Sequence, residues 1–539
     1  MSIDVRPELL VTGARVQTFG PSAGGADAML VGDGRVLAVG AVDEIVPLAG
    51  GAAQVELDGG CVLPGFCDTH MHLEKIAAEL SMVQLGPARS IEGVLDLIHA
   101  QLAGVTSRGW CQSFGDDNAW HERQLAEGRL PTRLELDSVA SEHPVFVYRG
   151  PDAAVLNSAA ITALGDRIAS LDGWQPESGL LRSPSAKELQ TAIPIASNQL
   201  DQLGQAAQRL LGFGITSIVD PGLPGTFEHS WQLYREARAA GLLAPRTWLM
   251  DRLDHRLPFD LELSRVSQGP SRFDGDDRLH GFGLKLILDG EFGNAWMREG
   301  EPQGTAPTCH YTLDEIRVVL RFCFERGWPA TFHVMGGGAI AAVLAAADEE
   351  RVSGRVLERG QLTLAHVFYP SADDLRAIVA LGISLSVQPL LAYVFEEEMT
   401  EAWGEAAHRA NPFRLMLDLG ADVSAGSDVL PCEPLRSASY AVNRRSRRGS
   451  VLGGDQALRP LEALSLHTSG AANYLRRPGL GALEPGSPAD FVWWPHDPLA
   501  LSPDEWPDLT PGLVAVAGET VWEAGATFAR HFESRRTHT

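Results

Sequence analysis

Two histidines separated by one residue end an apolar segment near the N-terminus and could bind a metal ion. In PGFCDTHMH, residues 64–72, the side chains of Asp68, His70 and His72 occupy alternate positions. On a β-strand, alternate side chains share one face, so two imidazoles at these positions can bind one ion from the same side. The alternative is structural, because histidines at strand ends are often simply hydrogen-bonded.

A lysine in an apolar segment offers a different ligand. Lys285 lies in GFGLKLILDG, and burial of an ammonium group disfavours its charged form. We therefore expect a lowered pKa and a neutral amine, which can react with CO₂ to form a carbamate (N6-carboxylysine). A carbamate is an anionic oxygen ligand that can bridge two cations. The alternative is an ion pair between Lys285 and Asp289 or another carboxylate.

Three further candidates each follow an apolar segment. His333 ends ATFHV, His366 ends LTLAH, and Asp428 follows DVSAGS. Taken singly, the histidines could be hydrogen-bonded core residues and Asp428 a helix or turn cap. Taken together, nitrogen and oxygen donors of this kind suit Zn²⁺ and related divalent ions. The predicted metal ligands are His70, His72, Lys285, His333, His366 and Asp428.

Parallel strands would have to position these ligands. Six times along the chain, a helical pattern ends in glycine and an apolar strand follows, at Gly214, Gly241, Gly327, Gly360, Gly382 and Gly420. Such alternation of helices and strands implies a parallel sheet. The segments around His70 and Lys285 bring the number of strands to eight. This predicts a (β/α)₈ TIM-like barrel, with an open doubly wound sheet as the alternative, and the candidate ligands fall at the carboxyl ends of its strands, where barrels carry active groups.

The two ends of the chain have a different character from its middle. Both consist of short apolar segments broken by Gly and Asp, so we expect residues 1–63 and 480–539 to form one composite β-sandwich. Residues 64–479 would then form the barrel. Because roughly 140 residues separate His72 from the next strand, we predict an insertion after the first barrel strand, at about residues 105–200.

Composition narrows the class of protein. The chain has 539 residues and a net charge of −25, which argues against a nucleic-acid or anionic-membrane partner. It contains no apolar stretch long enough to span a bilayer and no signal-peptide pattern, so we expect a cytoplasmic protein. Its six cysteines form no CxxC motif, which argues against disulfides or a zinc finger. The expected partners are a small-molecule substrate and, in a homodimer, a second copy of the chain.

Motifs along nearly the whole chain resemble those of the amidohydrolase superfamily, and within it the YtcJ-like group (amidohydrolase family 3), which includes N-substituted formamide deformylases. The similar stretches include LPGFCDTHMHLE, GITSIVDPG, LKLILDGEFG, FHVMGGG, LAHVFYP, NPFRLMLDLGADVSAGSDVLP and ALSLHTSGAANYL. The resemblance implies a metal-bearing (β/α)₈ barrel with a small β-sandwich formed by both termini.

The resemblance also implies roles for individual residues. His70 and His72 would bind the more buried metal, which Asp428 would contact while transferring protons. Lys285, as the carbamate, would bridge to a second metal bound by His333 and His366. In a mononuclear variant, Lys285 would stay unmodified.

The chain departs from the family pattern at positions near the substrate. HVMGGG lacks an acidic residue after His333, Ala365 replaces a frequent Glu, and Trp296 stands in a segment that is usually small and rich in hydroxyl groups. A family histidine before Asn157 is missing, and Asp152 and Ala153 occupy that region. These differences concern the substrate more than the reaction class.

Other residues are candidates for supporting the ligands or binding substrate. Asp68 and Asp289 could support ligands. Trp296, Tyr393 and Phe395 suggest a partly apolar pocket, although such residues often only pack. Arg149 and Arg252 could bind a substrate anion, or could be solvated surface arginines.

The predicted reaction is hydrolysis of a non-peptide amide-type C–N bond, in a formamide, an N-acyl compound or a cyclic amide. Asp428 would act as general base and then as general acid. The same metal barrel could instead catalyse decarboxylation or lactone, ester or phosphoester hydrolysis. A barrel reused as a non-catalytic scaffold is a third alternative.

Overall fold

The computed structural model describes residues 5–20, 25–103, 109–114, 122–150, 153–182, 186, 189, 193, 199–302, 304, 307–428 and 431–525. The chain divides into two compact units, and each is described by itself. One unit comprises residues 1–72 together with 207–539, and the other is Leu73–Ala206.

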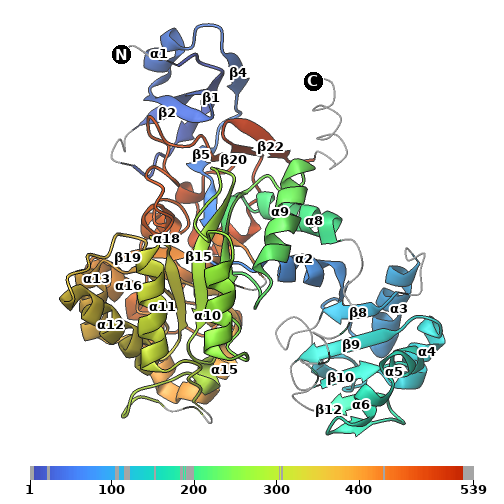
Figure 1. Ribbon diagram of the computed structural model, residues 1–539. Coiled ribbons are helices and arrows are strands. Elements are labelled where there is room, and N and C mark those ends of the chain that lie inside the picture. The colour runs from blue at the N-terminus through green and yellow to red at the C-terminus, as the bar shows by residue number, and fades with distance from the viewer. Residues whose placement is uncertain are drawn as a thin grey trace. The chain divides into compact units, whose positions relative to one another are not determined.

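Eight parallel strands form the centre of the first unit (Figure 1). They are β6 (Phe66–Asp68), β13 (Ile215–Asp220), β14 (Arg246–Arg252), β15 (Leu279–Ile287), β16 (Ala330–Val334), β17 (Leu362–His366), β18 (Ser384–Val387) and β19 (Asp422–Ala425). They pair in chain order, and beyond their ends a parallel bridge joins Met71 to Asp428. The first and last strands are therefore linked, which gives the predicted TIM-like barrel rather than an open sheet.

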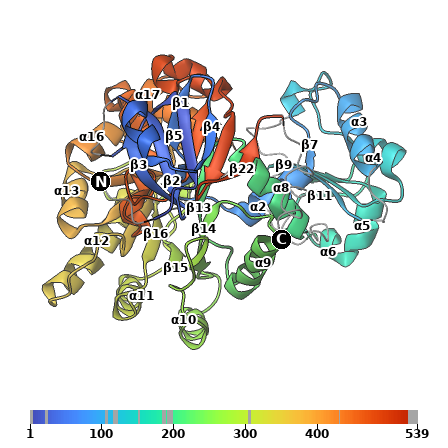
Figure 2. The same ribbon diagram turned by 90° about the horizontal axis from the view of Figure 1, so that it is seen from above.

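Helices follow the strands and lie outside them, as Figure 2 shows for α9 to α13. The helices of this unit after β13 are α9 (Phe227–Ala239), α10 (Phe259–Gln268), α11 (Leu313–Glu325), α12 (Gly337–Val352), α13 (Ala372–Leu381), α14 (Pro389–Val394), α15 (Glu396–Trp403), α16 (Phe413–Asp418), α17 (Pro434–Asn443), α18 (Pro460–Leu466) and α19 (Ala471–Tyr474). The six glycines predicted to end helices all have φ between 66° and 82°. This left-handed conformation lets the chain turn toward the next strand, although α12 already ends at Val352, eight residues before Gly360.

The two ends of the chain come together in one β structure, as the sequence predicts, and its strands form a single mixed sheet. Its strands are β1 (Leu9–Val16), β2 (Ala26–Gly32), β3 (Arg35–Gly40), β4 (Ala53–Glu56), β5 (Cys61–Pro64), β20 (Phe491–Trp494), β21 (Leu513–Val516) and β22 (Glu519–Glu523). Strand β5 joins the halves because it pairs with both β1 and β20. Residues from both termini, such as Met29, Val62 and Phe491, pack in one apolar cluster. Gly65 separates β5 from the first barrel strand, β6.

The second unit has its own sheet and helices. Its strands are β7 (Val83–Gln84), β8 (Cys111–Phe114), β9 (Val145–Gly150), β10 (Ala153–Leu156), β11 (Trp174–Gln175) and β12 (Leu180–Arg182), in the order β11-β12-β10-β9-β8-β7. Its helices include α2 (Leu73–Ser81), α3 (Ile91–Leu102), α4 (Arg133–Ala140), α5 (Ser158–Leu164) and α6 (Asp166–Ala169). The unit begins directly after His72, earlier than the insertion expected from about residue 105. It also has its own apolar cores, which explains why it forms a separate body.

Within the described part of the chain, no helix is both long enough and apolar enough to cross a bilayer.

A buried histidine near the first barrel strand should make stability depend on pH. His467 packs edge-on against Phe66, and neither ring nitrogen has a hydrogen-bond partner among the described residues. Burial lowers the pKa of His467 to about 3. Between pH 6.5 and 3 the unfolded chain binds a proton that the folded chain does not, so stability falls as pH falls, by about 2 kcal/mol at pH 5.

Replacing His467 with Leu should remove this contribution. We expect the melting temperature of His467→Leu to fall less steeply between pH 7 and pH 5 than that of the wild type. The comparison concerns the slope, so a uniform change in stability does not affect it. Parallel slopes would contradict a neutral buried His467.

Candidate metal centre

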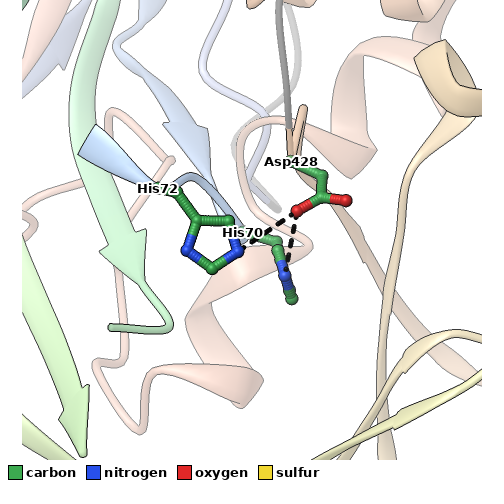
Figure 3. A group of neighbouring side chains, drawn as sticks. All are labelled: His70, His72 and Asp428. Carbon is green, nitrogen blue, oxygen red and sulfur yellow. Dashed lines mark ion pairs between the residues drawn. The ribbon is translucent and has the colours of Figure 1, made fainter. Parts of the chain in front are cut away.

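Three of the predicted ligands lie together where the first and last barrel strands meet (Figure 3). The Nε2 atoms of His70 and His72 each lie 3.4 Å from Oδ1 of Asp428. One potential ligand atom from each residue lies within 4.8 Å of the others. This spacing suits two imidazoles and a carboxylate around one divalent ion.

Two more predicted ligands adjoin this group. The ring centroids of His70 and His366 are 4.9 Å apart, and those of His366 and His333 are 4.2 Å apart. The three histidines come from the ends of β6, β17 and β16. The predicted convergence of distant strands is therefore present in the structure.

Lys285 is fully buried on β15, beside these histidines. Its Nζ has no hydrogen-bond partner among the described residues. Burial lowers the pKa of Lys285 to about 7, although the charge of Asp428 opposes that shift. The alternative, an ion pair with Asp289, is not found between these two described residues, and both carboxylate oxygens of Asp289 accept backbone N–H groups elsewhere.

Burial keeps three histidines of the cluster neutral. The pKa values of His70 and His333 lie well below the usual value, and that of His366 is about 3, chiefly because burial disfavours the charged form. Burial alone would raise the pKa of Asp428, but its interactions with His72, His70 and His366 hold that pKa well below its usual value. Neutral imidazoles and an ionised carboxylate are the forms that bind metal.

Several nitrogen atoms in the cluster have no hydrogen-bond partner among the described residues. They are Nδ1 of His72, Nε2 of His333, Nδ1 of His366 and Nζ of Lys285. Buried polar atoms are normally hydrogen-bonded, so unpaired atoms of this kind call for an explanation. A divalent cation, which accepts nitrogen lone pairs, fits this donor set.

Two of the predicted ligands have strained backbones. His366 has φ of 78° and Asp428 has φ of 66°, in the left-handed region that non-glycine residues rarely adopt. Such strain persists only where the surrounding structure imposes it, and it concentrates at functional sites. Here it turns the side chains at the ends of β17 and β19.

Asp68 supports the cluster through the backbone. Its carboxylate accepts the N–H of His70 at 3.1 Å and the N–H of Ser427 at 3.0 Å. It therefore links the strand that carries His70 to the turn that carries Asp428. The sequence predicted support for a histidine, and the structure shows that the contact is to the main chain.

Gly426 leaves room for this link, which gives a prediction. A Cβ atom at Gly426 would lie 2.4 Å from the N of His70 and 2.8 Å from Oδ1 of Asp68. Gly426→Ala should therefore push the two strands apart, destabilise the protein by about 1–3 kcal/mol and weaken metal binding. Gly51→Ala is the control, because a Cβ atom there meets nothing within 4 Å. Thermal melting and metal titration would check this, and a Gly426→Ala protein that matches Gly51→Ala in both would contradict it.

Asp289 and Trp296 form a second support, behind His333. Asp289 accepts the N–H groups of Met335, Gly336 and Trp296, at 2.9, 2.9 and 3.0 Å. The carbonyl of Trp296 accepts the N–H of Gly338 at 2.9 Å. A Cβ atom at Gly336 would lie 2.3 Å from that carbonyl oxygen. The lack of side chains in the GGG run therefore allows the segment that carries Trp296 to pack close to the backbone.

The remaining substrate candidates are dispersed. Tyr393 stacks edge-on with Tyr440 and lies beneath Arg436, and Phe395 contacts Phe292, so both take part in packing. Arg149 belongs to the second unit, where it is buried with its Nε 3.2 Å from Glu122 rather than solvated. Asp152 lies outside the described residues.

Sequence reasoning missed Gln388 as a contact of the cluster. Its side chain is fully buried and interacts electrostatically with His366, and its Nε2 donates to the carbonyl of Ser386 at 3.0 Å. The segment ISLSVQP places Gln388 directly after a barrel strand, and that position was the available signal.

Comparison with known proteins shows the family to which the chain belongs. Residues 54–522 match the model of the amidohydrolase family Amidohydro_3. N-substituted formamide deformylase of Arthrobacter pascens is 27% identical over 537 residues, which cover 93% of this chain and 96% of that protein. The putative amidohydrolase YtcJ of Bacillus subtilis is 22% identical and covers 92% of this chain and 96% of its own.

Solved structures share the fold. An uncharacterized metal-dependent hydrolase from Pyrococcus horikoshii superposes with a TM-score of 0.75 at 24% identity, covering 92% of this chain and 99% of that one. Atrazine chlorohydrolase TrzN from Arthrobacter aurescens, whose structure was solved with zinc, has a TM-score of 0.53 at 15% identity and covers 98% and 99% of the two chains. The family model spans most of the sequence, and the chain therefore belongs to the amidohydrolase family as a metal-dependent hydrolase of the amidohydrolase superfamily.

Proposed function

We propose that this hydrolase cleaves a non-peptide amide-type C–N bond, in a formamide, an N-acyl compound or a cyclic amide. One observation carries the proposal: neutral nitrogen donors and an ionised carboxylate from distant strands converge at the carboxyl end of the barrel. The similarity to a formamide deformylase over nearly the whole chain supports the choice of an amide.

The proposed ligands fall into two groups. His70, His72 and Asp428 would bind one divalent ion, for which Zn²⁺ suits the nitrogen and oxygen donors. His333 and His366 would bind a second ion, with Lys285 between the groups as a carbamate. The lowered pKa of the Lys285 amine and its lack of a hydrogen-bond partner among the described residues support this modification.

Asp428 would carry the proton during the reaction. A divalent metal, when bound, acidifies water and polarises the substrate carbonyl. Asp428 accepts a proton from the attacking water while the water oxygen forms a bond to the carbonyl carbon. The C–N bond then breaks, and Asp428 returns the proton to the departing nitrogen, which leaves as an amine. His70, His72 and the backbone support from Asp68 hold this carboxylate in place.

A panel of compounds tests the reaction class. The metal-loaded protein should release amine and carboxylic acid in equal amounts from an N-substituted formamide, an N-acyl amino acid or a cyclic amide. The same panel includes lactones and carboxylic acids, which test the alternative reactions of ester hydrolysis and decarboxylation. Release of CO₂ without new amine would indicate decarboxylation, and acid release from lactones alone would indicate an esterase; either result would overturn the proposal.

A further inference from the structure

An arginine at the end of the third barrel strand faces the barrel interior. Asp251, the residue before it, binds Arg265 of α10 at 2.8 Å and Arg272 at 2.9 Å, so Asp251 faces outward. Because side chains alternate along a strand, Arg252 faces the opposite side. Its Cα is paired in register with Lys285, which places Arg252 one strand from the candidate metal ligands.

The charge of Arg252 is not neutralised by a direct contact. Its Nε is buried and has no hydrogen-bond partner, and no carboxylate forms an ion pair with it within the described ranges. Burial lowers the pKa of Arg252, although Asp428 and Asp254 oppose the shift from a distance. Arg252 is partly buried rather than fully buried. A partly desolvated cation without a partner is costly, and an incoming anion offsets that cost.

Other unpaired polar groups surround the guanidinium. The rings of His255, which follows β14, and His310, which follows β15, stack with centroids 3.8 Å apart. The N–H of His310 donates to the carbonyl of Leu288 at 2.8 Å, which ties this segment to the end of β15. In the part of the chain that the structure describes, Nδ1 of His255 and the hydroxyl of Tyr311 are buried without partners.

The electrostatics of this group indicate a ligand that accepts hydrogen bonds. Burial lowers the pKa of His255 to about 4, with contributions from His310 and Arg252, so its imidazole is neutral. Burial raises the pKa of the Tyr311 hydroxyl, which therefore stays protonated and can donate. The group thus offers one fixed positive charge and neutral donors, which matches a monoanion such as a carboxylate better than a phosphate dianion.

We propose that Arg252, His255 and Tyr311 bind a carboxylate of the substrate, so that the preferred substrates are amides with a carboxylate close to the scissile bond, such as N-acyl or N-formyl amino acids. The inference rests on the proposed amide hydrolysis at the same barrel end. Arg252 presents two parallel N–H donors, which pair with the two oxygens of a carboxylate. The competing role for Arg252 is to neutralise a carbamate on Lys285.

A matched pair of substrates separates these roles. N-formylphenylalanine and N-(2-phenylethyl)formamide have the same formamide and ring and differ by the carboxylate. The wild-type holoenzyme should prefer the acid in kcat/KM, and Arg252→Gln should reduce that preference by about 100-fold, mainly through KM. Arg252→Lys should recover part of it, because lysine keeps the charge but not the paired donors.

Arg256→Gln is the control for lost charge. Arg256 lies four residues after Arg252 in the chain. Its side chain is 69% exposed and pairs with Asp254. The Arg256→Gln variant should keep the wild-type preference for N-formylphenylalanine over the neutral formamide. If Arg252→Gln loses kcat/KM equally on both substrates and also contains less metal, Arg252 supports the metal centre and the proposed carboxylate site is overturned. A wild-type enzyme that prefers the neutral formamide would also overturn the proposal.

Binding without turnover distinguishes this inference from the proposed reaction. Calorimetry with the holoenzyme should show that 3-phenylpropionate binds and 3-phenylpropanol does not, and that Arg252→Gln weakens binding of the acid at least tenfold, by about 1.4 kcal/mol. If neither formamide is hydrolysed but this pattern holds, the carboxylate site stands and amide hydrolysis fails. Equal binding of the acid to wild type and Arg252→Gln would mean that the acid binds elsewhere, which would overturn the inference.

Discussion

Replacing Asp428 with Asn should lower kcat for amide hydrolysis by about 10²–10⁴-fold, because asparagine cannot accept the proton of the attacking water. The substitution keeps the shape of the side chain at a strained position, φ 66°, that Asn tolerates well. Its amide oxygen can still face the histidines at the position where Asp428 lies 3.4 Å from both. The loss should therefore appear mainly in kcat, measured as amine release at saturating substrate.

Metal analysis of the same samples separates the two roles of Asp428. If the variant retains metal and loses kcat, the carboxylate carries the proton; if it loses metal as well, it is also an essential ligand. Asp418→Asn is a suitable control, since that carboxylate is 59% exposed and pairs with Arg414. Wild-type kcat in Asp428→Asn would contradict the assigned role.

Lys285→Met should abolish binding of the second metal ion and reduce kcat/KM by at least about 100-fold, since even outer contacts of a metal site are worth 10–100-fold. Methionine has a similar length and no amine, so it cannot form a carbamate. Because Lys285 is fully buried and its amine is unpaired among the described residues, the variant should melt no lower than the wild type. A loss of activity with unchanged melting would thus report on chemistry rather than folding.

Carbon-13 NMR of protein incubated with labelled bicarbonate would detect the carbamate directly. We expect a carbamate signal in the wild type and in Lys75→Met, whose lysine is 49% exposed, and none in Lys285→Met. A bare ammonium at Lys285 in electron density, or two metal ions in Lys285→Met, would rule out the bridging role.

The barrel could be predicted from local signals. Each glycine that ends a helix, such as Gly214 or Gly420, requires a left-handed conformation, and each is followed by an apolar strand. Ligand positions followed from the same pattern, because a strand end in a barrel determines where its side chain lies. The boundary of the second unit could not be predicted in this way, since α2 directly after His72 continues the helix–strand rhythm while packing into another body.

Supporting contacts depend on long-range geometry that a sequence does not show. Asp68 alternates with His70 and His72 as a ligand would, yet it binds the main chain of His70 and Ser427. Arg252 and Arg149 looked alike in the sequence. In the structure Arg149 pairs with Glu122, whereas Arg252 faces the barrel interior without a carboxylate partner among the described residues.

Metal content tests the central claim most directly. Protein stripped by a chelator and titrated with Zn²⁺ should regain amine-releasing activity in step with binding of one or two ions per chain. The double variant His70→Asn/His72→Asn, which keeps the backbone link through Asp68, should lose the ion bound near Asp428 and all of that activity. Full activity in stripped protein, or wild-type metal binding by the double variant, would contradict a metal centre at these residues.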